Sequence, residues 1–194
     1  ELTLLLALTT SLSANALDFS KLSYSINGGV NLTNNSEVDN SDNLLGFSVG
    51  GRASLPMDNQ LSISADLNFS QAGTKTSVTE GSTTTETELR RNYITVPVNL
   101  NYNVTEQASL NFGPYVGYLV NANSISKEGS NASVETDIKS STRTLDYGIQ
   151  LGASTQIEQF TVSAQYTLGL NKTTGEAITA EQKNSGFTFT TGYN

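Results

Sequence analysis

The chain has 194 residues, of which 14% are charged, and its formal net charge is −8 at pH 7. A net negative charge disfavours nucleic-acid binding, because phosphate contacts depend on clustered Lys and Arg. The sequence contains neither cysteine nor histidine, which excludes disulfides, thiolate chemistry, the commonest general base and the commonest metal ligand. We therefore expect no cofactor, no metal site and no nucleic-acid partner.

The first segment of the chain has the pattern of a secretory signal peptide. Residues 2–8 form a short apolar run, and Ala14-Asn15-Ala16 has the small-x-small pattern of a cleavage site. Because no initiator Met or basic segment precedes the run, we interpret residues 1–16 as a signal-peptide remnant. Residues 17–194 are then a single mature domain. The chain has no apolar run of the about 20 residues that a membrane-spanning helix needs.

From residue 22 to residue 193, apolar and polar residues alternate in eight successive runs. Alternation with a period of two predicts β-strands whose two faces differ in polarity. Each run keeps its parity for roughly 10 residues, or about 33 Å, enough for a tilted strand to cross the apolar band of an outer membrane. The runs are 22–32, 45–55, 61–69, 94–102, 110–120, 145–153, 160–170 and 187–193.

The polar faces of these runs consist mostly of Ser, Asn, Thr and Gly, with few charged residues. Small neutral side chains suit a narrow, crowded lumen better than a surface in water, where Lys and Glu are common. The apolar, aromatic-bearing faces then meet lipid. The alternative is a secreted soluble lipocalin-like barrel, in which the apolar faces point inward and bind a small apolar ligand.

The predicted connections alternate in length. Tight links follow the second, fourth and sixth runs, at residues 56–60, 103–107 and 158–159. Longer loops follow the first, third, fifth and seventh runs, at residues 34–43, 73–90, 123–142 and 172–185. Short turns at one rim and long loops at the other are typical of periplasmic turns and extracellular loops. The sequence therefore predicts an all-β, eight-stranded antiparallel up-and-down transmembrane β-barrel over residues 17–194.

Two strands carry motifs of a known family. Residues 93–102 read YITVPVNLNY, and residues 112–119 read FGPYVGYL. The chain resembles the outer-membrane β-barrel-domain (PorT-like, porin-family) proteins of Bacteroidetes in these motifs, and the resemblance extends over the mature chain. It implies a barrel of OmpA/OmpX-like architecture in the bacterial outer membrane, and it carries no specific role.

Four charged residues have the parity of the lumen: Arg52, Asp66, Arg91 and Asp146. One interpretation is a gate or selectivity constriction, since opposite charges in a narrow lumen control ion passage. The other is a structural ion-pair network that plugs the barrel, because a buried charge requires a partner.

These features predict a non-enzymatic protein with a structural or surface-interaction role. We expect a monomer that contacts outer-membrane lipid and lipopolysaccharide, with any surface partner at the loops 34–43, 73–90, 123–142 and 172–185. A narrow channel for ions or small solutes is the second alternative, beside the soluble barrel.

Overall fold

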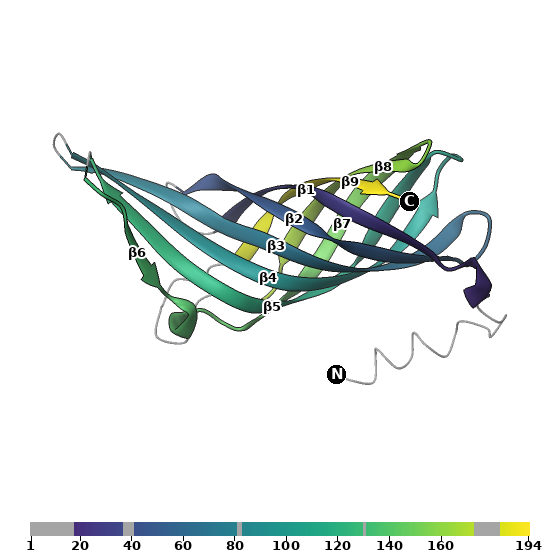
Figure 1. The fold of residues 1–194 in the computed structure, drawn as a ribbon, viewed down its shortest axis with the longest axis horizontal. Helices are drawn as coiled ribbons and strands as arrows, with labels where there is room; N and C mark the ends of the chain where they lie inside the picture. Colours follow the sequence, from purple (N-terminus) through teal and green to yellow (C-terminus); the bar gives the residue numbers. More distant parts are fainter. Residues whose placement is uncertain (1–17, 37–40, 81–82, 130, 173–182) are drawn as a thin grey trace.

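The computed structural model describes residues 18–36, 41–80, 83–129, 131–172 and 183–194. The predicted signal-peptide remnant, residues 1–16, lies outside them. The described elements are two short 3₁₀ helices and nine strands (Figure 1): η1 (Phe19–Lys21), β1 (Ser23–Ser36), β2 (Ser41–Pro56), β3 (Leu61–Glu80), β4 (Thr83–Asn103), β5 (Ala108–Glu128), β6 (Val134–Asp137), η2 (Lys139–Ser141), β7 (Leu145–Ile157), β8 (Phe160–Gly169) and β9 (Lys183–Tyr193). Neither helical segment has the length and hydropathy needed to cross a membrane.

Eight of the strands form a closed ring. The hydrogen-bonded order is β4-β3-β2-β1-β9-β8-β7-β5, and the pairing of β4 with β5 closes it. Every pairing is antiparallel. The ring satisfies the backbone groups of each strand from both sides, as lipid requires. The predicted eight-stranded up-and-down barrel is confirmed.

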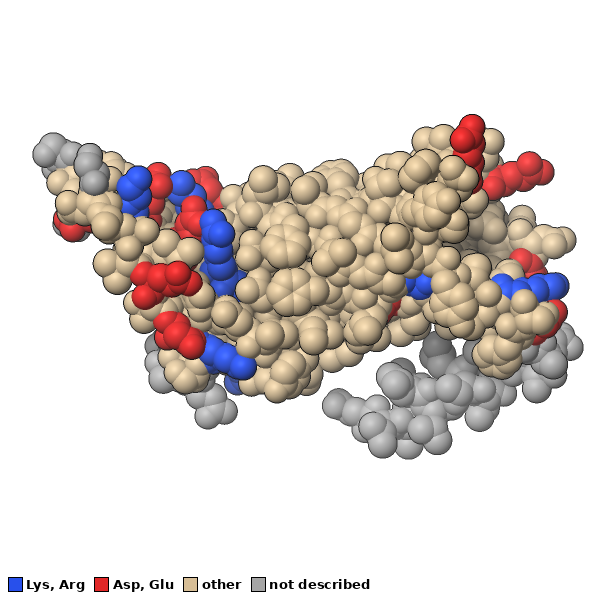
Figure 2. Space-filling model, in the orientation of Figure 1, with Lys and Arg blue, Asp and Glu red and all other residues tan. Residues whose placement is uncertain are grey.

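The two faces of the ring have the predicted polarity. The outward side chains Ile26 and Leu151 are 69% and 60% exposed, whereas the inward Asn99 and Asn111 are 1% and 2% exposed. Figure 2 shows a broad uncharged band between charged ends. An exposed apolar wall around a polar interior is stable in lipid and not in water. The soluble lipocalin-like alternative is therefore wrong, because it requires the apolar faces inside.

The tight links lie at one end of the barrel, as predicted. Met57 N donates to Leu61 O and Val104 N donates to Ala108 O, each at 2.8 Å. The third link is a two-residue turn in which Glu158 has a φ of 54°. Short turns are typical of the periplasmic end of an outer-membrane barrel, so we call this end periplasmic and the opposite end extracellular.

The predicted long loops are largely wrong in extent. Most of 73–90 is not a loop, because β3 and β4 continue as a paired hairpin to Glu80 and Thr83. Within 123–142, β5 continues to Glu128, and β6 and η2 follow. In the predicted loop 34–43, residues 34–36 belong to β1 and residues 41–43 belong to β2. Residues 37–40 lie outside the described residues. In the fourth loop, 173–182 also lie outside, and β9 begins at Lys183.

β6 is a ninth strand that the alternation does not predict. It pairs with β5 from Asn123 to Ser126, beyond the level at which β7 leaves β5 (Figure 1). The extended parts of β3, β4 and β5 together with β6 project past the barrel. We call residues 74–80, 83–90, 122–128 and 134–137 the extracellular sheet.

Candidate functional site in the barrel lumen

The first predicted pair of lumen charges forms an ion pair across two neighbouring strands. Arg52 on β2 lies directly opposite Asp66 on β3 in the ladder. Arg52 Nε donates to Asp66 Oδ1 at 2.6 Å, and Nη2 donates to Oδ2 at 3.0 Å. The Asp66 side chain is 3% exposed and the Arg52 side chain 18%. This two-point contact compensates a carboxylate that is otherwise removed from water.

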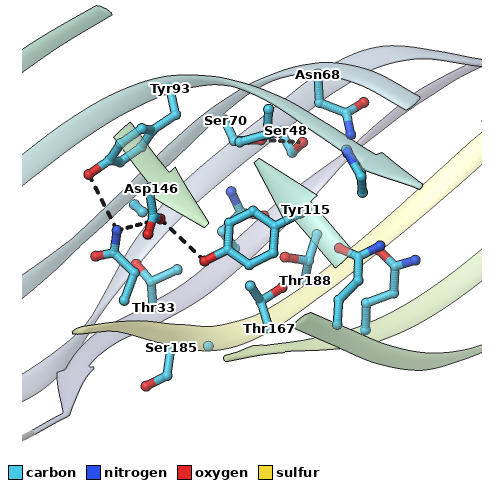
Figure 3. A pocket seen from close by; sticks show the side chains of 18 residues that line it. Thr33, Ser48, Asn68, Ser70, Tyr93, Tyr115, Asp146, Thr167, Ser185 and Thr188 are labelled. Carbon is cyan, nitrogen blue, oxygen red and sulfur yellow. Dashed lines mark hydrogen bonds between the residues drawn. The ribbon is translucent and has the colours of Figure 1, made fainter. Parts of the chain in front are cut away.

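The second predicted pair lies in a separate cluster nearer the extracellular end. Asp146 Oδ2 accepts hydrogen bonds from Tyr115 Oη at 3.3 Å and from Asn184 Nδ2 at 3.0 Å (Figure 3). Asn184 Nδ2 also lies 3.3 Å from Tyr93 Oη. Arg91 is 2% exposed and interacts electrostatically with both Asp146 and Tyr93. Within the described part of the chain, no ion pair links this cluster to Arg52 and Asp66.

Amide side chains form hydrogen bonds inside the lumen between strands that are separated by one other strand of the ring. Gln150 Nε2 on β7 donates to Asn99 Oδ1 on β4 at 2.9 Å. Gln165 Nε2 on β8 lies 3.3 Å from Asn111 Oδ1 on β5. All four residues are buried. Each of these two hydrogen bonds bridges one intervening strand, and the bond between Asn184 on β9 and Tyr93 on β4 joins opposite walls.

An apolar cluster lies at the extracellular end of the lumen. Tyr93, Leu119 and Ala122 are its buried members, and Ala72 and Ile138 pack against it. Ile138, which precedes η2, is held there because its backbone N–H donates to Ala122 O at 2.9 Å. The segment after β6 is therefore anchored to the barrel by both a hydrogen bond and apolar contact.

An upper and a lower cavity lie in the lumen formed by the described residues. The upper one, beside Tyr115 and Asp146, has a volume of about 90 Å³, room for about three water molecules at roughly 30 Å³ each. The lower one, at the periplasmic end, measures about 320 Å³ and includes Arg52 in its lining. We call the lower cavity the periplasmic chamber.

The extracellular sheet carries most of its charges on the face continuous with the outer wall. Lys75 Nζ lies 3.0 Å from Glu86 Oε2, and Arg90 Nη2 lies 2.7 Å from Glu88 Oε2. The hydrogen bond to Glu86 raises the pKa of the Lys75 ammonium above its ordinary value. Asn123 on β5 also donates to Glu135 on β6. The contacts of Lys75 with Glu86 and of Asn123 with Glu135 join neighbouring strands, whereas Arg90 and Glu88 lie along β4. Cross-strand pairs stabilise a sheet that has little apolar surface to bury.

Sequence reasoning did not identify Tyr93, Tyr115 and Asn184 as partners of the lumen charges. The available signal was that Tyr93 and Tyr115 are aromatic residues with lumen parity, among small polar neighbours. Asn184 carries no such signal, because its position depends on the register of β9 against β1.

Comparison with known proteins gives the family. Residues 10–175 match the family of the outer membrane protein beta-barrel domain. The chain belongs to this family. The match agrees with the apolar outer wall of the ring, and the protein is located in the bacterial outer membrane. No curated protein matches this outer membrane beta-barrel domain in sequence.

Two solved structures are similar to this outer membrane beta-barrel domain. Ail, the attachment invasion locus protein of Yersinia pestis, is 15% identical with a TM-score of 0.49. Neisserial surface protein A is 11% identical with a TM-score of 0.45. Each alignment covers 89% of this chain and 96% of the other chain.

Proposed function

We propose that this barrel is a non-enzymatic surface-interaction protein whose partner binds the extracellular sheet. The observation that carries the proposal is the inequality of strand lengths. β3, β4 and β5 have 20 or 21 residues, whereas β8 and β9 have 10 and 11. At about 3.3 Å per residue, a strand of 20 residues is about 66 Å long, roughly twice what an outer membrane needs. The excess projects as ordered structure from the extracellular end.

The extracellular sheet offers two chemically different faces. Charged residues continue the outer wall: Lys75 lies opposite Glu88, Lys127 lies opposite Glu86, and Glu135 on β6 lies opposite Ile125 on β5. The opposite face carries mainly hydroxyl side chains, such as those of Thr87 and Ser126, which are cross-strand neighbours 3.5 Å apart. A rigid sheet binds a partner with little loss of conformational entropy, which favours recognition.

The free edge of β6 is a second feature that supports partner binding. Within the described residues, β6 pairs with β5 alone, so one row of its backbone N–H and C=O groups has no strand partner. An edge of this kind accepts an extended segment from another chain.

The lumen supports neither catalysis nor conduction. The sequence has no histidine or cysteine to act as general base or nucleophile. The hydrogen-bonded amide side chains at mid-lumen and the apolar cluster at the extracellular end leave no wide passage, since the upper cavity has a volume of only about 90 Å³. We infer that Arg52, Asp66, Arg91 and Asp146 are structural, and not a gate.

Lipopolysaccharide is the lipid partner that we propose for the basic side chains of the outer rim, which alternate there with acidic residues such as Glu88, Glu128 and Asp137. The chain has ten Lys and Arg residues, and seven of them lie toward the extracellular end: Lys75, Arg90, Lys127, Lys139, Arg143, Lys172 and Lys183. The periplasmic turns carry the acidic residues Asp58, Glu106 and Glu158. Basic side chains at the outer rim are suited to the phosphates of lipopolysaccharide.

The narrower kinship that we propose is with the PorT-like, porin-family barrels of Bacteroidetes. The strand motifs at residues 93–102 and 112–119 support it. In the structure these motifs form adjacent parts of β4 and β5.

The test shortens the hairpin and leaves the barrel intact. Residues 77–86 are replaced with Asn-Gly, which fits a two-residue turn because Thr76 and Thr87 are directly opposite. Cells that display each protein are assayed for adhesion to a panel of immobilised polysaccharides and extracellular proteins. We expect adhesion by the wild type and its loss in the shortened variant, whereas Glu106→Ser in a periplasmic turn retains it. Equal adhesion by all three, or none by the wild type, contradicts the proposal.

A further inference from the structure

The periplasmic chamber has the size and position of a ligand site. Its volume is about 320 Å³, and every strand of the ring contributes to its lining. Sites for small molecules have volumes from about 300 Å³ upward. The chamber lies beside the short turns at residues 57–60, 104–107 and 158–159, so it belongs to the periplasmic end.

The chamber exists because the lower inward positions carry unusually small side chains. Eight serines line it, among them Ser25, Ser54 and Ser163. Higher in the lumen the inward positions are taken by larger residues such as Tyr115 and Gln150. In an eight-stranded barrel the interior is only wide enough to be filled by side chains. Serine at so many positions leaves open a space that longer side chains would fill.

Arg52 supplies the one charged group in the lining. A guanidinium has five N–H donors, and Asp66 accepts from Nε and Nη2. Asp66 does not line the chamber, so it binds the guanidinium on the side that faces away from the chamber. The part of Arg52 that reaches the chamber presents fixed donors, suited to a hydroxyl or carboxylate oxygen.

The chamber is closed toward the extracellular end. The hydrogen bonds of Gln150 with Asn99 and of Gln165 with Asn111 each bridge one intervening strand above the chamber, and the bond of Asn184 with Tyr93 joins opposite strands. None of these residues lines the chamber, and the apolar cluster lies further along. A solute therefore enters and leaves from the periplasm.

We infer that the periplasmic chamber binds one small polyhydroxylated solute, either a monosaccharide or its uronic acid. Serine hydroxyls and the amides of Asn101 and Asn103 both donate and accept hydrogen bonds, which matches a molecule with a hydroxyl on most carbons. The lining contains no aromatic residue and no large aliphatic one. An apolar ligand would leave these polar groups without partners, at a cost in free energy.

The experiment is saturation-transfer NMR on the barrel in nanodiscs, with glucose, glucuronate and toluene as probes. Ser25→Leu fills the chamber, and Ser25 has no hydrogen bond among those described for the chain; Ser54→Leu is a second filling variant. Thr191→Leu places the same leucine side chain on the outer wall, since Thr191 alternates with the inward Thr190. Heat-modifiability of each variant verifies that it is folded.

We expect glucose or glucuronate to bind the wild type and the Thr191→Leu variant. We expect any toluene signal to be the same in the wild type and in the filling variants, because toluene does not bind in the chamber. Affinity falls at least about tenfold in either folded filling variant, because the added methyl groups occupy the site. Stronger binding of glucuronate than of glucose assigns the carboxylate to Arg52. If neither glucose nor glucuronate binds to the wild type, the chamber is filled by water alone and the inference is overturned. Binding that survives in a folded filling variant overturns it as well.

Discussion

The Arg52 guanidinium and the Asp66 carboxylate meet at two points, with Nε 2.6 Å from Oδ1 and Nη2 3.0 Å from Oδ2. The pair joins β2 to β3 inside the barrel, where Asp66 is almost fully removed from solvent. One member of such a pair cannot be removed without leaving the other buried and uncompensated.

We therefore expect Arg52→Met to destabilise the barrel by about 3 kcal/mol, since it leaves the Asp66 charge without its partner. The double variant Arg52→Met/Asp66→Leu should regain most of that loss, because it removes both charges. Urea unfolding in detergent, followed by the loss of heat-modifiable mobility, gives both values. A double variant as unstable as the single one would show that the pair contributes favourable energy beyond compensating a buried charge.

The hydrogen bond from Tyr115 to Asp146 provides a second prediction. Tyr115→Phe removes the donor and leaves Asp146 Oδ2 with Asn184 as its hydrogen-bonding side chain. We expect a loss of about 1 to 3 kcal/mol in unfolding free energy, as for a buried charged acceptor that loses one bond. Tyr118→Phe on the lipid-facing wall is the matched control and should change stability little. Equal effects at both positions would argue against a structural role for the Asp146 cluster.

Substitution of two adjacent glycines on β1 should have different effects on barrel assembly. A Cβ at Gly29 would lie 1.9 Å from Phe189 O on β9, whereas a Cβ at Gly28 would have its nearest neighbour, Ser48 O, at 3.9 Å. Gly29 thus permits the close approach of the two strands that complete the ring. We expect Gly29→Ala to reduce the yield of heat-modifiable barrel severalfold and Gly28→Ala to leave it unchanged. Comparable yields would show that the β1–β9 pairing adjusts to the added methyl group.

The closed lumen predicts that the barrel does not conduct ions. In planar bilayers the wild type should show no discrete single-channel conductance, because hydrogen-bonded amide side chains and the apolar cluster occupy the middle and upper parts of the lumen. Reproducible steps that scale with salt concentration would favour the channel alternative and would require the upper lumen to open.

The period-two pattern predicted the ring well because each lipid-facing position carries an energetic penalty for polarity. Ile26, Leu151 and their equivalents lie outward as expected, and the tight turns fall where predicted. The same reasoning failed at residues 73–90, where neither face meets lipid and threonine and charged residues alternate without an apolar side. There the strands rest on backbone ladders and pairs such as Lys75 with Glu86. Threonine's preference for strands was the remaining signal.

For the lumen, the sequence predicted which charges point inward and not which of them meet. Arg52 and Asp66 are neighbours through one hairpin, so their contact follows from the β2–β3 register. The surroundings of Asp146 depend on β4, β5, β7 and β9 at once. No local pattern contains that information, because it arises only when the ring closes.

The pairing of β1 with β9 has a consequence for biogenesis. These strands come from opposite ends of the barrel sequence and share eleven paired positions, from Ile26 with Tyr193 to Ser36 with Lys183. Until β9 has been synthesised and exported, β1 and β8 both remain open edges able to pair with other chains. Such contacts between distant segments also form slowly. Until the last strand pairs with the first, the unassembled polypeptide therefore exposes strand edges that are prone to aggregation.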